Sequence, residues 1–193
     1  LNDTLLPEPL LDVNVAIETE RGMLGIAVKK HYNLPTYVFL YFTESNRDAD
    51  DVCPQVTFCT GGADPLGNRL YRYELKDNKL VNPKLLLDIP ATTVSKHLGG
   101  AITIGSDDNI YLIVGDGHSC YANCERMKSV LWSQTSNEEY GSPVEGRGGI
   151  LRVSPEGKEV QAGGILGKKY PLNLFFAYGI RNGFGLDFVP ITG

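Results

Sequence analysis

The feature that most constrains the fold is a strand pattern that recurs along the chain. The segment G-I-A-V at 25–28 opens one strand, and G-A-I-T-I at 100–104 opens another 75 residues later. The segment G-L-D-F at 185–188 begins a third, 85 residues after the second. A second motif recurs in phase, because Arg72 and Arg152 lie 80 residues apart in similar strand-like runs. Recurrence at this spacing is typical of repeat architectures, in which each unit is one supersecondary module.

Runs of alternating, β-branched and aromatic residues between turn residues predict the strands themselves. The expected strands are 24–28, 37–43, 69–75, 85–89, 101–104, 110–114, 150–153 and 177–180. The polar segment G-S-D-D-N at 105–109 is a tight turn of the kind that joins two strands of a hairpin. The best helix candidate, 125–133, is short, and the 22 glycines and 11 prolines suit short strands and turns. The sequence therefore predicts an all-β fold.

The repeat also indicates how the strands are grouped. Each unit contains an inner strand, a second strand, a long insertion and an arginine-bearing strand, and the first unit adds an outer strand at 85–89. Consecutive four-stranded units are typical of a β-propeller, because a unit buries both faces only when neighbours stack around an axis. We expect residues 1–193 to form one partial β-propeller of two to three blades. A β-sandwich with accidental repetition is the alternative.

Composition excludes several classes of protein. Hydrophobic residues make up 42% of the chain and charged residues 21%, which is typical of a folded globular domain and not of a disordered one. The net charge is −5 and no basic run occurs, which argues against a nucleic-acid partner. No run of about 18 apolar residues is present, so the sequence predicts no membrane span.

The four cysteines form two local pairs, Cys53 with Cys59 and Cys120 with Cys124. Each pair lies in a polar segment between expected strands, so we predict two disulfides that close long loops in an oxidising compartment. Free thiols are one alternative. A zinc site is the other, although the spacings C-x5-C and C-x3-C fit structural zinc poorly.

Three segments carry a family resemblance when they are taken in order. The first is E-R-G-M-L-G-I-A at 20–27, and the second is H-L-G-G at 97–100 with the run from 104 to 116 that ends in V-G-D. The third is A-Y-G-I-R-N-G-F-G-L at 177–186. Together they resemble the glucose/sorbosone dehydrogenase family, which includes the soluble quinoprotein sugar dehydrogenases, from about residue 10 to residue 193.

The resemblance implies a six-bladed propeller, of which this chain would be the N-terminal portion. It implies pyrroloquinoline quinone (PQQ) as cofactor, Ca²⁺ to polarise the quinone, a sugar as substrate and a separate electron acceptor. The reaction would oxidise the anomeric carbon of an aldose to a lactone. The chain begins with Leu1 and ends in I-T-G, so we expect a protein truncated at both ends, with any signal sequence upstream. The predicted disulfides imply an exported (extracytoplasmic) location.

Four residues are candidates for the site. His97 is the catalytic candidate, because a base must take the hydroxyl proton as hydride leaves, and imidazole exchanges protons near neutral pH. The resemblance assigns Arg181 and Asn182 to the quinone, and a guanidinium suits the carboxylates of that cofactor. It assigns Glu20 to the neighbourhood of the sugar.

Other polar residues receive no catalytic assignment. Asp107, Asp108 and Asp116 lack the full pattern of a calcium loop, so turn chemistry is the better interpretation and no metal ligand is assigned. His31 and His118 lie in expected loops without partners at motif spacing. The quinone–calcium ligands of the family lie beyond the third segment.

Two departures weaken the match. Lys96 stands where sugar-active relatives often have aspartate, so glucose specificity is not implied, and K-K-H-Y at 29–32 replaces the family's H-P-D-F/Y. In-phase recurrence indicates that Arg72 and Arg152 serve the blade architecture rather than the site.

Two other functions remain open at this point. One is a non-catalytic propeller that binds glycans or proteins, and the other is a propeller hydrolase such as a lactonase, for which no acidic calcium cluster is evident. An open arc of blades exposes apolar sheet faces, so we expect residues 1–193 alone to be marginally stable and inactive.

Overall fold

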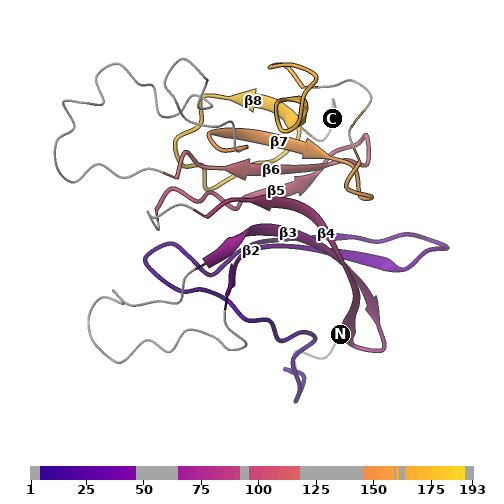
Figure 1. Cartoon of the computed structure of the whole chain (residues 1–193). Coiled ribbons are helices and arrows are strands. Elements are labelled where there is room, and N and C mark those ends of the chain that lie inside the picture. The colour runs from indigo at the N-terminus through magenta and orange to yellow at the C-terminus, as the bar shows by residue number, and fades with distance from the viewer. Residues whose placement is uncertain are drawn as a thin grey trace.

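The computed structural model describes residues 5–46, 65–91, 96–117, 146–158, 160 and 164–189. These residues form two four-stranded antiparallel sheets that lie one over the other (Figure 1). The first sheet contains β1 (Met23–Lys29), β2 (Thr36–Ser45), β3 (Pro65–Lys76) and β4 (Lys79–Ile89). The second contains β5 (Ile102–Ile104), β6 (Ile110–Val114), β7 (Gly149–Val153) and β8 (Phe175–Tyr178), with the short 3₁₀ helix η3 (Leu172–Leu174) before β8. The all-β prediction is confirmed, and each sheet is one propeller blade.

In both sheets the strands follow one another in chain order, as in a propeller blade. Only β6 has the predicted bounds, and the larger differences are in β3, which begins four residues earlier than predicted, and in β4 and β8. β4 begins six residues earlier than predicted, because Asp77 and Asn78 adopt positive φ values of 49° and 57° and turn β3 directly into β4. β8 lies two residues earlier than predicted, and it ends at Tyr178 because Gly179 has a φ of 92°.

The third unit predicted at 185–188 does not form a strand in the structure. Residues 182–189 are described but lie outside regular secondary structure. A strand needs a hydrogen-bonded neighbour, and the described part of the chain provides none for this segment. The Phe188 ring packs edge-on against Tyr111, with 4.8 Å between ring centroids, so the segment runs along the second sheet.

The two sheets share one apolar layer. The side chains of Phe39 and Tyr41 on β2 are fully buried in it, and they belong to the same cluster as Leu112 and Leu151 of the second sheet. The alternate β2 residues, such as Val38, belong to a second cluster on the opposite face, which the N-terminal residues Leu11, Val13 and Val15 help to cover. Because β2 is buried on both faces, its sequence reads as a continuous apolar run.

The recurring glycines mark the point where the two backbones meet. A Cβ atom added to Gly25 on β1 would lie 2.0 Å from the carbonyl oxygen of Gly100, just before β5. A Cβ added to Gly100 would lie 2.6 Å from the carbonyl oxygen of Leu24, and Gly100 also has a φ of 118°. Only glycine on both sides allows the blades to approach this closely. At Gly25 and Gly100 the recurring glycine is therefore a packing requirement.

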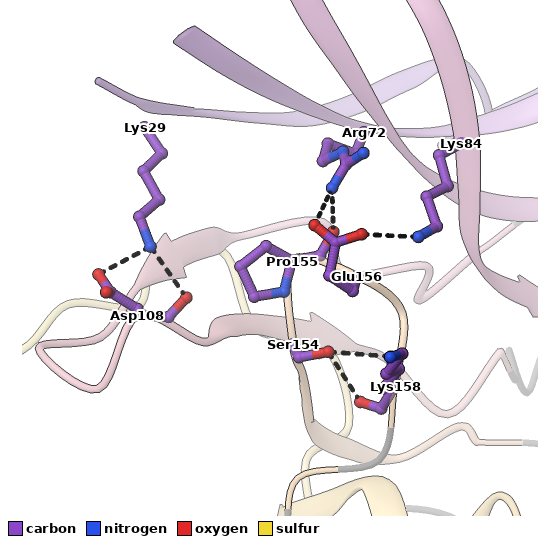
Figure 2. Close-up of polar contacts among 8 residues, drawn as sticks. All are labelled: Lys29, Arg72, Lys84, Asp108, Ser154, Pro155, Glu156 and Lys158. Atoms are coloured by element: carbon purple, nitrogen blue, oxygen red, sulfur yellow. Dashed lines mark hydrogen bonds and ion pairs between the residues drawn. The ribbon is translucent and has the colours of Figure 1, made fainter. Parts of the chain in front are cut away.

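Ion pairs join the two sheets at one end of the strands. Glu156, in the turn after β7, accepts hydrogen bonds from Arg72 of β3 and, at 2.8 Å, from Lys84 of β4 (Figure 2). The Arg72 side chain is almost fully buried, so this contact is part of the packing. Arg152, its in-phase counterpart, lies over the Phe176 ring at 5.7 Å. Both contacts agree with the architectural interpretation of these arginines.

A second pair lies at the same end. The Nζ atom of Lys29 lies 2.7 Å from Oδ1 of Asp108, in the turn between β5 and β6 (Figure 2). The turn after β7 is closed by its own hydrogen bonds, in which Ser154 accepts from the Lys158 amide at 2.9 Å. The two turns of the second sheet therefore present acidic residues to basic residues of the first.

The four cysteines, His118 and the helix candidate 125–133 lie outside the described residues, so the predicted disulfides stay predictions. Among the residues that the structure does describe, no helix is long and apolar enough to span a bilayer.

We expect Gly25→Ala to lower the free energy of unfolding by roughly 1–3 kcal/mol, because the new methyl group has no room beside Gly100. Denaturant unfolding of the two proteins measures the change. The matched control is Gly185→Ala, since no atom lies within 4 Å of a Cβ at that position. Equal effects of the two substitutions would contradict the packing argument.

The ion pairs predict a pH dependence of stability. Hydrogen bonding to Lys84, and secondarily to Arg72, lowers the pKa of Glu156 below its ordinary value of 4.5. The stabilisation that the ionised Glu156 carboxylate provides is therefore complete above the ordinary pKa. It is lost as the pH falls through the lowered pKa. Because the Glu156 side chain is 48% exposed, solvent screens the pair and the effect is small.

We expect Glu156→Gln to remove this part of the acid dependence. Unfolding midpoints measured between about pH 6 and pH 3 should converge for the variant and the wild type at the acidic end. Glu8→Gln, which removes an exposed carboxylate paired with Lys79, controls for the loss of charge alone. Parallel pH profiles for wild type and Glu156→Gln would show that the Glu156 ion pairs do not contribute to the acid dependence of stability.

Candidate functional site

The candidate residues gather at the end of the strands opposite to the ion pairs. Glu20 lies just before β1, and His97 lies before β5. Asp116 follows β6, and Arg181 and Asn182 follow β8. The Asp116 amide donates a hydrogen bond of 2.9 Å to the Arg181 carbonyl, which brings the segments after β6 and β8 together. The strand ends of the second blade thus bring together residues from three separate parts of the sequence.

The hairpin register explains why His97 and Asp116 meet. Ile102 of β5 pairs with Leu112 of β6, and each step back along β5 is one step forward along β6. His97, five residues before Ile102, therefore falls opposite Gly117, five residues after Leu112. The Gly117 amide indeed donates a hydrogen bond of 3.1 Å to the His97 carbonyl. Asp116 is next to this point of contact.

His97 and Asp116 form a buried pair. The Nδ1 atom of His97 lies 2.9 Å from Oδ1 of Asp116, and the residues are only 7% and 8% exposed. A carboxylate oxygen accepts hydrogen bonds, so the Nδ1 atom carries the proton. In the neutral ring this leaves Nε2 as an acceptor. The imidazole is thus oriented with a basic nitrogen directed away from its carboxylate partner.

The backbone of His97 adopts an uncommon conformation. Its φ is 56°, in the left-handed region that few residues other than glycine occupy. The His97 amide donates a hydrogen bond of 2.7 Å to Oε2 of Glu20. The His97 carbonyl comes so close to Gly115 that a Cβ there would lie 2.0 Å from the oxygen. Contacts on both sides of the peptide therefore hold the left-handed turn.

Asn182 completes a small network around this turn. Its Nδ2 atom donates to Oε2 of Glu20 at 3.2 Å, and its Oδ1 atom accepts from the Gly99 amide at 3.3 Å. The structure thus brings three of the four candidates, Glu20, His97 and Asn182, into direct contact. The fourth, Arg181, is adjacent in sequence, and its side chain is exposed.

Asp116 corrects one interpretation of the sequence. The sequence favoured turn chemistry for three aspartates, and this holds for Asp107, whose carboxylate accepts bonds from Asn109 and Tyr111. Asp116 instead is buried against His97. The signal that could have shown this is the register of the hairpin, which places the residue after Gly115 beside the histidine.

Arg147 is a second charged residue that sequence reasoning missed. It directly precedes Gly148, whose amide donates to the carbonyls of Val114 and Gly115 at 3.1 Å each. Burial lowers the pKa of the Arg147 guanidinium, while the Asp116 carboxylate acts in the opposite direction. The opposite charges of Arg147 and Asp116 therefore attract each other, and the pairing of β7 with β6 brings their segments side by side. No sequence motif indicates this, because Arg147 follows a long insertion.

The described residues can be compared with the needs of the implied cofactor and metal. The exposed guanidinium of Arg181 offers a donor fork for a carboxylate, so it fits an anionic quinone. In the described ranges no three His, Cys, Asp or Glu side chains gather as candidate metal ligands. Arg181 could therefore meet a carboxylate of such a quinone, and the described ranges hold no calcium cage.

Comparison with solved structures shows the same fold in several dehydrogenases. An oxidoreductase described as a glucose dehydrogenase, from Thermus thermophilus, is 25% identical with a TM-score of 0.64; the match covers 95% of this chain and 46% of that protein. Another glucose dehydrogenase is 17% identical with a TM-score of 0.68, and the match covers 100% of this chain and 47% of that protein. The soluble aldose sugar dehydrogenase of Escherichia coli is 13% identical with a TM-score of 0.62, covering 94% and 44% respectively.

The chain spans slightly less than half the length of these structures. No curated protein sequence matches the chain. The family model described as Glucose / Sorbosone dehydrogenase matches residues 2–193, which is nearly the whole sequence. The ordered motifs, the two blades and this match agree, and the chain belongs to the glucose/sorbosone dehydrogenase family.

Proposed function

We propose that this chain is the N-terminal part of a PQQ-dependent dehydrogenase that oxidises the anomeric carbon of an aldose to a lactone. The observation that carries the proposal is the buried His97–Asp116 pair, which lies beside the exposed Arg181. A histidine oriented by a carboxylate is a recurrent arrangement for general base catalysis. Family membership supplies the class of reaction.

His97 is the base in this proposal. The hydroxyl group on the anomeric carbon gives its proton to Nε2 of His97, while the hydrogen on the same carbon leaves with two electrons as hydride. The carbon–oxygen single bond becomes the lactone carbonyl. Asp116 holds the Nδ1 proton throughout and stabilises the imidazolium that forms. The quinone, when bound, supplies the two-electron acceptor for the hydride.

The other candidates bind and orient. Arg181 would hold a carboxylate of the quinone through its guanidinium. Asn182 follows it in the chain, and its amide is fixed by Glu20 and Gly99. Glu20 contacts the sugar through Oε1, because Oε2 already accepts two hydrogen bonds. Calcium ligands and further cofactor contacts come from the rest of a longer protein, since this chain spans less than half of the similar structures.

The location proposed for the protein is extracytoplasmic. Two local cysteine pairs, in segments that the sequence predicts to be loops, suit an oxidising compartment. A separate electron acceptor would reoxidise the quinone there.

The first test uses the full-length protein reconstituted with PQQ and Ca²⁺ and assayed for dye reduction with a panel of aldoses. We expect His97→Ala to lower kcat by roughly 10²–10⁴-fold, because general base catalysis contributes about that factor. Quinone binding, followed by its absorbance, should persist in the variant. No quinone-dependent activity of the wild type on any aldose would instead favour a non-catalytic binding module.

The second test concerns the role of Asp116 in fixing the tautomer of His97. An asparagine at this position can donate as well as accept, so the side chain no longer requires a proton on Nδ1. We expect Asp116→Asn to shift the neutral ring toward the Nε2–H tautomer and to lower kcat by up to about 10⁴-fold. Imidazole ¹⁵N chemical shifts report the tautomer directly, and an unchanged tautomer would contradict the assigned role of Asp116.

A further inference from the structure

We infer that Glu20 is a positioning residue, whose Oε2 atom holds the His97 peptide and the Asn182 side chain in place. The hydrogen bonds stand independently of any activity, and only their kinetic consequence rests on the proposed function. The His97 amide and Asn182 Nδ2 reach the same oxygen, at 2.7 and 3.2 Å. A carboxylate oxygen can accept both bonds at once, and bonds to an ionised acceptor are stronger than neutral ones.

The orientation of Asn182 supports this assignment. Its Oδ1 atom accepts from the Gly99 amide, and its Nδ2 atom donates to Glu20. Exchanging the two atoms would set a donor against the Gly99 N–H group and an acceptor against the carboxylate. The network therefore has one satisfactory arrangement. In that arrangement Glu20 holds the amide of His97 and Asn182 holds the amide of Gly99.

The backbone of His97 needs these hydrogen bonds because its own conformation is unfavourable. A non-glycine residue with φ of 56° is strained, and such strain persists only where neighbouring contacts maintain it. The Gly117 amide fixes the carbonyl side of His97, and Glu20 fixes the amide side. Since the backbone direction sets the path of the side chain, the bond to Glu20 helps to place the imidazole against Asp116.

Glu20 also makes the site depend on both blades. It precedes β1 of the first sheet, whereas His97 and Asn182 belong to segments of the second. The contact between Gly25 and Gly100 sets the distance between these segments, five residues after Glu20 and three after His97. The bond from His97 to Glu20 therefore joins the blades at the site itself.

This role differs from sugar binding in what it requires of the side chain. Positioning needs an acceptor oxygen at the distance that glutamate reaches, and it does not need Oε1, which takes no hydrogen bond within the described residues. Glutamine keeps an acceptor oxygen at the same reach. Aspartate keeps the charge but is one methylene shorter, so its oxygen falls short of the His97 amide. Length and charge can thus be separated by substitution.

The test compares wild type, Glu20→Gln, Glu20→Asp and Glu20→Ala in the full-length protein without quinone or sugar. Amide hydrogen exchange at His97, followed by NMR, reports the bond to Glu20. We expect protection in wild type and Glu20→Gln, and exchange roughly 10- to 100-fold faster in Glu20→Asp and Glu20→Ala. Glu8→Ala, an exposed carboxylate paired with Lys79, is the matched control and should keep the His97 protection.

Wild-type exchange rates at His97 in both Glu20→Asp and Glu20→Ala would overturn the assignment. If Glu20→Ala does not fold, the comparison of Glu20→Asp with Glu20→Gln decides by itself. In the active holoenzyme, positioning predicts that Glu20→Asp lowers kcat more than it raises KM, whereas a purely sugar-binding glutamate would raise KM alone. Absence of any sugar oxidation would refute the proposed function while the exchange rates still decide the role of Glu20.

Discussion

The structure depends on the packing of the two blades across one apolar layer, with their backbones in contact at Gly25 and Gly100. The fully buried rings of Phe39 and Tyr41 fill the layer, and the glycines let β1 approach the segment before β5. A side chain at either glycine would push the sheets apart. His97 lies only three residues before Gly100. The contact that packs the blades therefore also places the candidate base.

Most of the fold could be predicted because this packing requires two features that are visible in the sequence. Close backbone contact requires glycine at positions 25 and 100, the first two of the recurring pattern, and burial of β2 on both faces produced a continuous apolar run. The bounds of β4 and β8 were harder to predict. They depend on the left-handed residues Asp77 and Asn78 and on the conformation of Gly179, which residue types indicate only weakly. The strand expected at 185–188 depends on a neighbour, which a local pattern does not reveal.

The site was predicted less completely. Glu20, His97 and Asn182 came from motifs, and the structure brings them into contact. Asp116 was misinterpreted because a polar residue after glycine at a strand end resembles a turn. The register of the hairpin, which sets Gly117 opposite His97 and Asp116 next to it, would have indicated the contact. Arg147 gave no signal, since its position beside Asp116 follows from the pairing of β7 with β6 after a long insertion. Contacts that depend on strand order are invisible to motifs.

The two ends of the blades use charge in different ways. At the end with the ion pairs, the carboxylates of Asp108 and Glu156 are 76% and 48% exposed, so water and salt screen them and their contribution to stability is small. At the site end, His97 and Asp116 are buried and their bond is directional. Loss of an exposed pair therefore changes how firmly the blades adhere, whereas loss of a buried bond changes where the imidazole lies. It follows that the position of the base is set by the apolar layer and the local network around His97, and is largely insulated from changes in the exposed charges.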